Sequence, residues 1–329
     1  MNKNKERITK VGLEACTLCQ LDCPGCGMRI HGNYCEIGGG FLTLANFKKF
    51  LALNPNVREI NLAHMGEVFL NPQLANILRY AHSHQVDIDI WDVNFNHVDD
   101  EVLELMVTCG VRNIKFSIDG ASPEAYAWYR RGGDFNKVIN NIKKLNNYKK
   151  LHRSTLPMLH WQYILFPSND NLKEINKAKK MAQELGMNEV VFVKDICGHV
   201  PSNLEMIKKE TGLDYATPSA HSQHRVFRWL RCYNLWNYPR INYDGRVLGC
   251  CGSVNDYGGE GVNAFEMSLE KIYQLPLIRD TQAMLMGKKD KNGQRIVRKD
   301  SPCFKCDVYQ NKIAGENWYI SEQELEDSG

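Results

Sequence analysis

Three cysteines near the start of the chain have the spacing of a metal-binding loop. Cys19, Cys23 and Cys26 follow a C-x3-C-x2-C pattern, and Pro24 and Gly25 lie between the last two, where they favour a tight turn. A cubane iron–sulfur cluster contains four irons and is normally held by four cysteine thiolates. Three thiolates leave one iron open to bind and activate another molecule. The spacing therefore predicts a cluster with an open iron.

Cys16 leaves a second interpretation open. With Cys16 included, the run becomes C-x2-C-x3-C-x2-C, and four thiolates can close a tetrahedral structural zinc site. Cys16 also lies at the end of an apolar run typical of a strand, where a small packed side chain is common. We favour the iron–sulfur cluster because of the segments that follow this loop in the chain.

The chain after residue 8 alternates between apolar runs and amphipathic segments. Runs typical of strands occupy residues 8–15, 57–63, 86–93, 111–118, 158–165 and 189–193. Helical patterns lie between them at residues 44–53, 72–84, 99–108, 135–148 and 172–185, and Ser122-Pro123-Glu124 is a typical helix start. Parallel strands joined by helices are the simplest arrangement for such a series. We predict an α/β fold, an open, partial (β/α)6 barrel near residues 8–195.

The cysteine loop resembles the defining motif of the radical S-adenosylmethionine (radical SAM) enzymes, a C-x3-C-x2-C sequence after the first barrel strand. The matching residues are Cys19, Cys23 and Cys26. The resemblance implies a [4Fe-4S] cluster whose open iron binds the amino and carboxylate groups of S-adenosylmethionine. One electron, from a flavodoxin- or ferredoxin-type donor, then cleaves the sulfonium and gives a 5′-deoxyadenosyl radical that abstracts hydrogen from a substrate. The family also has the partial barrel that the strand pattern predicts.

Polar segments after the next three strands resemble further parts of the family's cofactor site, which lies at the carboxyl ends of barrel strands. Segments 64–67, 94–96, 117–120 and 131–135 are similar in turn to Gly-Gly-Glu, Thr-Asn-Gly, Ser-x-Asp-Gly and Arg-Gly-x-x-Phe motifs, although Met65 replaces the first glycine. Each segment alone is equally typical of a turn or a helix start, and their shared order favours a cofactor site. The resemblance implies cofactor contacts from Gly66, Glu67, Asn94, Ser117, Asp119 and Arg131.

A second set of cysteines follows residue 215, around a predicted hairpin turn at residues 242–245. Four thiolates suit a closed site, either an iron–sulfur cluster or a structural zinc. The arrangement resembles the SPASM/twitch extension of radical SAM enzymes, in its shorter twitch form because no cysteine follows Cys306. The resemblance implies two domains, residues 1–215 and 216–329, and one auxiliary [4Fe-4S] cluster. Its implied ligands are Cys232, Cys250, Cys303 and Cys306, with Cys251 as an alternative to Cys250.

Composition narrows the class of partner and the compartment. The formal net charge is +3 and is spread along the chain, which argues against nucleic acid as the main partner. No apolar stretch is long enough to cross a bilayer, and the first ten residues do not resemble a secretory signal. Twelve cysteines in such a chain are more typical of metal binding than of disulfides. We therefore expect a cytoplasmic protein with no membrane or nucleic-acid partner.

A closed auxiliary cluster indicates the reaction type, because a substrate radical that loses a proton must pass its remaining electron to an acceptor. We predict a radical SAM oxidoreductase that oxidises a carbohydrate or aminocyclitol-like small molecule. The predicted barrel begins almost at the first residue, which leaves no room for a domain that binds a leader peptide. The alternatives are modification of a peptide or protein side chain, and a zinc-stabilised binding protein without catalysis.

The catalytic base is not assigned by any motif. Lys194, Asp195 and His199 follow the sixth predicted strand, where a base for the substrate would lie. The same residues are nearly as typical of a surface turn.

Overall fold

The computed structural model describes residues 8–27, 37–195, 198–215, 235–248, 259, 261–306, 309–310 and 319–321. The chain groups into two compact units. The sheet unit contains Glu14–Leu42 and Ile60–Ser219, and the hairpin unit contains Met1–Leu13, Thr43–Glu59 and Ala220–Gly329. This grouping joins two N-terminal segments to the C-terminal part of the chain. The two domains that we predict, residues 1–215 and 216–329, are each continuous in sequence. They stay a prediction.

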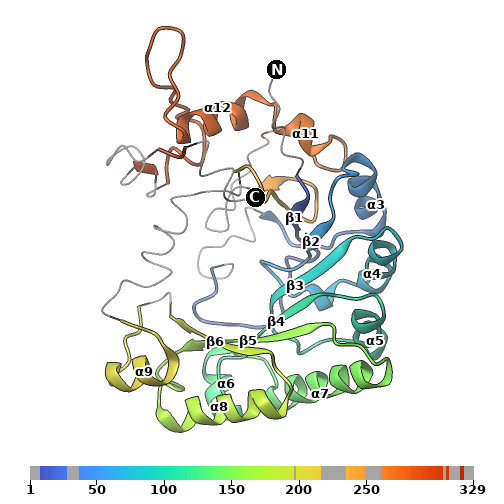
Figure 1. Cartoon of the computed structure of the whole chain (residues 1–329), viewed down its shortest axis with the longest axis vertical. Helices are drawn as coiled ribbons and strands as arrows, with labels where there is room; N and C mark the ends of the chain where they lie inside the picture. Colours follow the sequence, from blue (N-terminus) through green and yellow to red (C-terminus); the bar gives the residue numbers. More distant parts are fainter. Residues whose placement is uncertain are drawn as a thin grey trace. The chain divides into compact units, whose positions relative to one another are not determined.

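The sheet unit is built on strands that follow one another in the order of the chain (Figure 1). The order is β2 (Glu59–Asn61), β3 (Asp87–Val93), β4 (Asn113–Ser117), β5 (Met158–Leu165) and β6 (Glu189–Lys194). Strands β3 to β6 pair in parallel. The connecting helices are η1 (Val68–Leu70), α4 (Leu74–Ser83), α5 (Asp100–Thr108), α6 (Pro123–Tyr129), α7 (Phe135–Leu151) and α8 (Leu172–Glu184), and α9 (Leu204–Thr211) follows β6. The predicted parallel α/β fold is confirmed, whereas curvature into a partial barrel stays a prediction.

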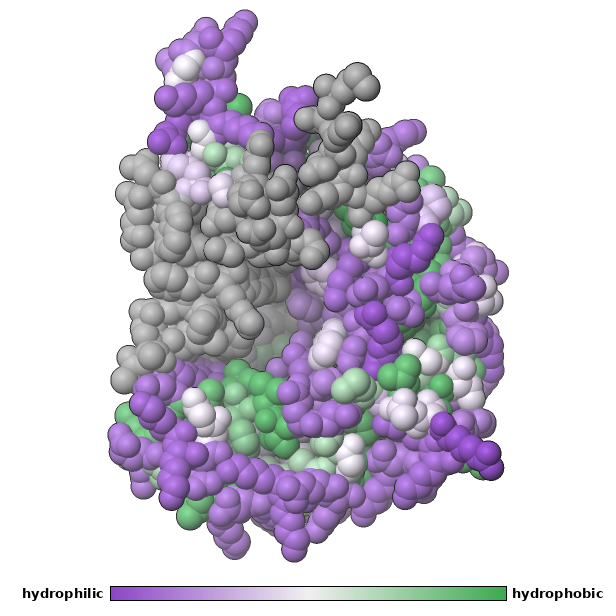
Figure 2. Space-filling view, viewed as in Figure 1, coloured by the Kyte–Doolittle hydropathy of each residue, from purple (hydrophilic) through white to green (hydrophobic). Residues whose placement is uncertain are grey.

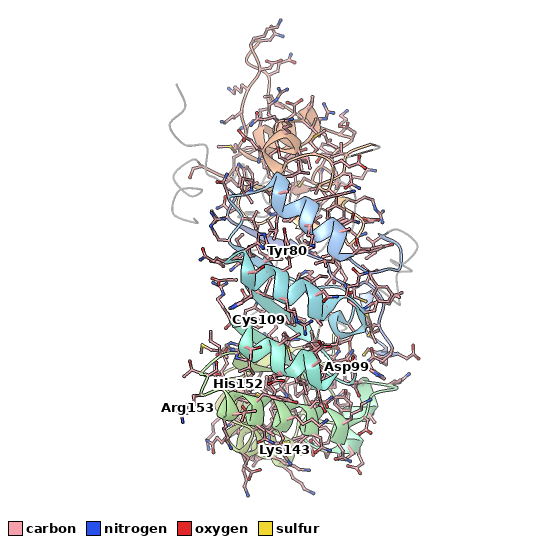
Figure 3. All side chains as sticks on the ribbon, turned by 90° about the vertical axis from the view of Figure 1, so that its right-hand side faces the viewer. Tyr80, Asp99, Cys109, Lys143, His152 and Arg153 are labelled. Carbon is pink, nitrogen blue, oxygen red and sulfur yellow. The ribbon has the colours of Figure 1, made fainter. Side chains whose placement is uncertain are left out.

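The two faces of this sheet differ in burial. In β5, Leu159, Trp161, Tyr163 and Leu165 are fully buried, and the residues between them are partly exposed. Successive side chains of a strand point to opposite faces, so one face forms the core. Helices α4, α5, α7 and α8 line one side of the sheet (Figure 1). Figure 3 shows the outer surface of this helical layer, from which Lys143 projects into solvent.

Local capping explains where the helices of this unit begin. Ser122 Oγ accepts the Ala125 N–H at 3.3 Å ahead of α6, and Pro123 occupies its first turn, as the sequence predicts. Asn171 caps α8 in the same way. Helix α6 ends at Tyr129, which makes Arg130 its C-cap residue. This end point positions the side chain of Arg130 for the site described below.

The hairpin unit contains the first strand and the predicted hairpin. Strand β1 (Lys10–Leu13) pairs in parallel with β7 (Arg240–Ile241), which pairs antiparallel with β8 (Val247–Leu248). The Asn242 N–H donates to the Arg246 carbonyl at 2.9 Å, and Gly245 supplies the positive φ of +93° that the turn requires. Helices α3 (Leu44–Leu53), α11 (Leu269–Ile272) and α12 (Pro276–Leu285) belong to the same unit. The predicted hairpin is confirmed.

The surface in view in Figure 2 is mostly hydrophilic among the residues coloured by hydropathy, with smaller hydrophobic areas. Among the described residues, no helix is long and apolar enough to cross a bilayer.

Candidate active site

The cysteine loop of the sheet unit forms one wall of a cavity of about 440 Å³. Cys19, Cys23 and Cys26 all line this cavity. The Cys26 N–H donates to the Cys23 carbonyl at 3.2 Å, which closes the turn between them. The Asp22 N–H donates to the Arg131 carbonyl at 2.8 Å and attaches the loop to the segment after α6. The three thiols of the motif therefore border one space.

Burial disfavours the ionised form of two of these thiols, and hydrogen-bond donors lie beside the same two. Burial raises the pKa of Cys19 to about 11 and also raises the pKa of Cys23, so a bound cation must displace the thiol protons. The Leu21 N–H and Asn94 Nδ2 each donate to Cys19 Sγ at 3.5 Å. Arg130 Nη1 donates to Cys23 Sγ at 3.8 Å. Hydrogen bonds of this kind stabilise sulfur ligands of iron–sulfur clusters.

Cys16 is separate from this cavity. Its side chain is fully buried, its Sγ donates to the Leu18 carbonyl at 3.4 Å, and burial raises its pKa to about 12. Among the described residues, no group of three or more His, Cys, Asp or Glu side chains is arranged to hold a metal ion. The thiolates of a cubane cluster need not converge on a single metal ion, because each one binds a different iron. Cys16 is thus set apart from the three cysteines that line the cavity, whose role as cluster ligands stays a prediction.

Glu67 is a buried lining residue with one unpartnered carboxylate oxygen among the described residues. The side chain lines the cavity and is 1% exposed. Its Oε2 accepts the Asn94 N–H at 2.8 Å, whereas its Oε1 has no hydrogen-bond partner in the described part of the chain. Burial raises the pKa of Glu67 to about 8, against the opposing effect of nearby backbone N–H groups. A buried acceptor without a partner is costly, so this oxygen fits a donor group of a ligand.

Gly66 allows the Glu67 backbone to run against the cysteine loop. A Cβ at position 66 would lie 2.4 Å from the Cys16 carbonyl oxygen, so no side chain fits there. The buried carboxylate of Glu14 accepts the Met65 N–H at 3.0 Å and fixes the turn from below. Met65, which replaces the first glycine of the motif, lines the cavity. No sequence motif singled out Glu14.

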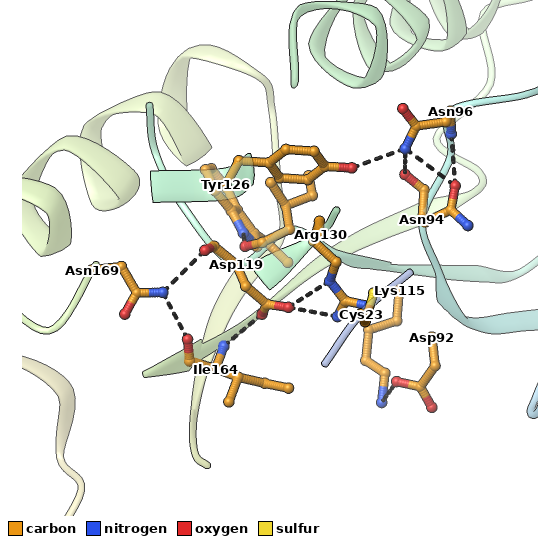
Figure 4. Close-up of polar contacts among 12 residues, drawn as sticks. Cys23, Asp92, Asn94, Asn96, Lys115, Asp119, Tyr126, Arg130, Ile164 and Asn169 are labelled. Atoms are coloured by element: carbon orange, nitrogen blue, oxygen red, sulfur yellow. Dashed lines mark hydrogen bonds and ion pairs between the residues drawn. The ribbon is translucent and has the colours of Figure 1, made fainter. Parts of the chain in front are cut away.

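Asn94 connects the cavity to the loops behind it (Figure 4). Its side chain lines the cavity and is 4% exposed. Its Oδ1 accepts Gln20 Nε2 at 2.7 Å and the Asn96 N–H at 3.1 Å. Asn96 Nδ2 in turn donates to the Tyr126 hydroxyl at 2.8 Å. The cysteine loop, the end of β3 and helix α6 are therefore joined by one network of amides.

Asp119 does not line the cavity but holds a residue that does. Its fully buried Oδ2 accepts Arg130 Nε at 2.6 Å and Nη2 at 2.5 Å, and its Oδ1 accepts the Ile164 N–H at 2.8 Å (Figure 4). Arg130 lines the cavity. Ser117 is buried and Arg131 is exposed, and neither is a lining residue. As cofactor contacts, Ser117, Asp119 and Arg131 stay predictions.

Sequence reasoning missed Arg130, Tyr129 and Asp92, which also line the cavity. Arg130 is adjacent to the predicted Arg131, and the end of α6 decides which of the two turns inward. Tyr129 stacks on Phe166 with ring centroids 3.9 Å apart. Asp92 has a positive φ of +64° where the register of β3 on β4 shifts, and its Oδ1 lies 2.7 Å from Lys115 Nζ. No sequence signal marks this irregularity, which re-aims a side chain as a β-bulge does.

A second polar cluster follows β5 and β6. His199 Nε2 lies 2.8 Å from Asp170 Oδ2, and the His199 N–H donates to Asp195 Oδ2 at 3.2 Å. Asp195 is 8% exposed, and its Oδ1 has no hydrogen-bond partner among the described residues. Lys194 Nζ donates to the Asp214 carbonyl at 2.5 Å. Of the three residues considered for a base, His199 therefore has a carboxylate that orients its ring, as a general base requires.

The C-terminal cysteine pair forms a compact turn. Cys303 is 9% exposed, and its N–H donates to Ser301 Oγ at 3.2 Å. The Cys306 N–H donates to the Cys303 carbonyl at 3.2 Å. The auxiliary cluster stays a prediction, because three of the cysteines considered for it lie outside the described residues: Cys232, Cys250 and Cys251.

Residues 13–161, which include every residue that lines the cavity, match the model of the Radical SAM superfamily. The AdoMet-dependent heme synthase of Methanosarcina barkeri is 26% identical over 170 residues, which are 51% of this chain and 45% of that protein. The match thus spans less than half the length of this curated relative. The crystal structure of Streptococcus suis SuiB bound to S-adenosylmethionine is similar to this chain, with a TM-score of 0.60 and 13% identity. The superposition covers 91% of this chain and 71% of the SuiB chain. SuiB bound to its precursor peptide SuiA gives a TM-score of 0.60 at 12% identity, over 91% of this chain and 70% of that one.

Proposed function

We propose that this chain, whose residues 13–161 match the model of the Radical SAM superfamily, is a radical SAM oxidoreductase that uses the cavity of the sheet unit for its cluster and its cofactor. Cys19, Cys23 and Cys26 would hold three irons of a [4Fe-4S] cluster. The observation that carries the proposal is that these three cysteines and the buried Glu67 line one space of about 440 Å³.

The residues that line the cavity fit both the [4Fe-4S] cluster and S-adenosylmethionine. The bound cluster and S-adenosylmethionine together supply a reductive cleavage that yields methionine and a 5′-deoxyadenosyl radical. Glu67 would bind the cofactor's ammonium group, because a cation that approaches a buried carboxyl lowers its pKa and ionises it. Gly66 lets the backbone beside Glu67 pack against the cysteine loop, where a side chain would collide with the Cys16 carbonyl oxygen. Part of the cavity wall is apolar and limits the access of water; it is formed by Leu18, Leu21 and Met65.

A row of polar and aromatic side chains lies on the partly exposed face of the sheet, formed by Trp91, Lys115 and His160. This row supports a small substrate that bears hydroxyl or amine groups. Lys115 and His160 are direct neighbours on β4 and β5, and the Trp91 ring lies 5.4 Å from the His160 ring and 5.4 Å from Lys115 Nζ. Asp92, which pairs with Lys115, also lines the cavity, so the row adjoins the cofactor. An aromatic platform beside charged groups suits polar cyclic molecules. We propose a carbohydrate or aminocyclitol-like substrate.

The proposed net reaction is a two-electron oxidation, in which the substrate loses one hydrogen atom, one proton and one electron. His199, oriented by Asp170, is the proposed proton acceptor. The Asp170 N–H donates to the carbonyl of Phe166, and Phe166 stacks on the lining residue Tyr129, so this loop is connected to the wall of the cavity. The electron would pass to the auxiliary [4Fe-4S] cluster predicted on Cys303, Cys306 and their partners Cys232 and Cys250.

Anaerobic reconstitution tests the proposal. The wild-type protein should be brown, should carry about eight irons per chain if both cubanes form, and should release 5′-deoxyadenosine when reduced with S-adenosylmethionine. The variant with Cys19, Cys23 and Cys26 all replaced by alanine should lose about half the iron and all cofactor cleavage. A colourless zinc protein, or cleavage that persists in this variant, would contradict the proposal.

Deuterium transfer separates the substrate classes. A panel of deuterated aminocyclitols and sugars should place deuterium in 5′-deoxyadenosine when a member binds beside Asp92. Transfer from a deuterated peptide side chain, with none from the small molecules, would assign the protein to peptide modification instead.

A further inference from the structure

The guanidinium of Arg130 is held rigidly at the edge of the cavity. Its Nε and Nη2 both donate to Asp119 Oδ2, at 2.6 and 2.5 Å. Asp119 is itself fixed, since it is fully buried and its Oδ1 accepts the Ile164 N–H at 2.8 Å. The Arg130 side chain is 14% exposed. Two of its three nitrogens are therefore committed to one immobile carboxylate.

The remaining nitrogen faces a cluster thiol. Arg130 Nη1 donates to Cys23 Sγ at 3.8 Å (Figure 4). The other side of the guanidinium packs against Tyr129, with 5.3 Å between Arg130 Cζ and the ring centroid. Cys19, by contrast, accepts from the neutral amide groups of Leu21 and Asn94. The two thiols thus differ in that one contacts a full positive charge.

A positive charge at this place favours the reduced state of a cluster. Reduction adds one negative charge to the cluster and its thiolates, and a charged donor stabilises that charge more than a neutral one does. The effect is large in a buried site, where solvent screens little. Charge and hydrogen bonding around the sulfur ligands are established determinants of cluster potential.

We propose that Arg130, oriented by Asp119, raises the reduction potential of the cluster bound through Cys23 and so makes it accessible to the electron donor. The inference rests on the proposed function. Arg130 acts through Cys23 and is a positioning residue, with Asp119 behind it.

A redox titration of the reconstituted protein, followed by electron paramagnetic resonance, tests this role. Arg130→Gln should move the midpoint potential of this cluster to a more negative value at unchanged iron content. Arg130→Lys should give an intermediate potential, because lysine keeps the charge but lacks the fork that grips Asp119. Asp119→Asn also removes a negative charge near Cys23, which alone would make the potential more positive. A net shift to a more negative value is expected, because Arg130 loses the carboxylate that orients it toward Cys23.

A second arginine–aspartate pair provides a matched control. Arg112 immediately precedes β4 and pairs with the buried Asp89 at 3.0 Å, whereas Asp119 lies just beyond the other end of that strand. Arg112→Gln should leave the cluster potential at its wild-type value. A shift equal to that of Arg130→Gln would show a general loss of rigidity and would overturn the proposal.

The other outcomes are distinct. A wild-type potential in Arg130→Gln, with full iron content, overturns the inference and leaves the proposed function intact. If Arg130→Gln fails to hold iron, a wild-type potential in Arg130→Lys together with a more positive potential in Asp119→Asn overturns it equally. Weaker S-adenosylmethionine binding without a change in potential would assign Arg130 to the cofactor's carboxylate instead. A wild-type protein that binds no iron refutes the proposed function itself.

Discussion

The two C-x2-C turns of this protein share one backbone hydrogen bond and have different surroundings. In both, the N–H of the second cysteine donates to the carbonyl of the first at 3.2 Å, between Cys26 and Cys23 and between Cys306 and Cys303. Cys23 is 6% exposed and Cys303 is 9% exposed. The spacing and its turn are therefore not what distinguishes the two sites.

The difference lies in what each turn faces. The turn of Cys23 borders a cavity that is also lined by Cys19, Arg130 and Glu67. The turn of Cys303 is closed by its own neighbour, since Ser301 Oγ accepts the Cys303 N–H. A thiol pair becomes part of a substrate site when other elements leave space and unpaired polar groups beside it.

Removal of the C-terminal pair should separate the two sites most sharply. The variant Cys303→Ala with Cys306→Ala should lose about four irons per chain, the content of one cubane, and should still cleave S-adenosylmethionine. Iron analysis and 5′-deoxyadenosine measurement check this. Complete loss of cleavage would show that the two sites depend on each other, and full iron retention would refute the auxiliary cluster.

Glu67→Gln should affect the first site alone. The variant loses a charged acceptor for the cofactor's ammonium group, so the affinity for S-adenosylmethionine should fall about 10- to 100-fold. Equilibrium dialysis measures the affinity, and unchanged iron content is the control. Wild-type affinity would remove Glu67 from the proposed cofactor site.

The same variant should alter the pH dependence of folding in the cofactor-free protein. The pKa of Glu67 is about 8 in the folded chain, against an ordinary value of 4.5, because burial disfavours its charge. The folded state keeps this proton longer, so the free energy of unfolding should fall as pH rises from 4.5 to 8, by at most about 5 kcal/mol from this group. Denaturant titrations across that range should show a smaller fall in Glu67→Gln, and an identical fall would contradict the assignment.

Cys16→Ala should have the smallest effect. Cys16 is fully buried outside the cavity, so the variant should keep all its iron and all cofactor cleavage. Its free energy of unfolding should drop by about 1 kcal/mol, the usual cost of a small cavity. A loss of iron measured by metal analysis would restore the four-thiolate interpretation.

Much of the fold was predictable because its signals are local. The alternation of residues 158–165 predicts the bounds of β5 without error, since burial on one face repeats every second residue. The helix start at Ser122 was equally predictable, because a cap bonds a backbone group three residues away. The cysteine motif and Glu67 lie together at one cavity, although their cofactor roles stay predictions.

The inward-facing arginine was not predictable. Arg130 and Arg131 are adjacent and chemically identical, and the end of α6 at Tyr129 together with the buried Asp119 decides which one reaches the cavity. Asp92 was missed for a similar reason, since its direction depends on the register of β3 on β4.

The sequence by itself determined the chemistry that is available: three closely spaced thiols, polar residues at strand ends, and a series of strands and helices that follow from neighbouring residues. The tertiary structure alone decided which side chains share the cavity and which pair with one another, as Asp119 pairs with Arg130. The physical reason is that a side chain's charge and partners depend on elements distant in the chain, and burial of Glu67 without a partner for Oε1 arises only when those elements pack.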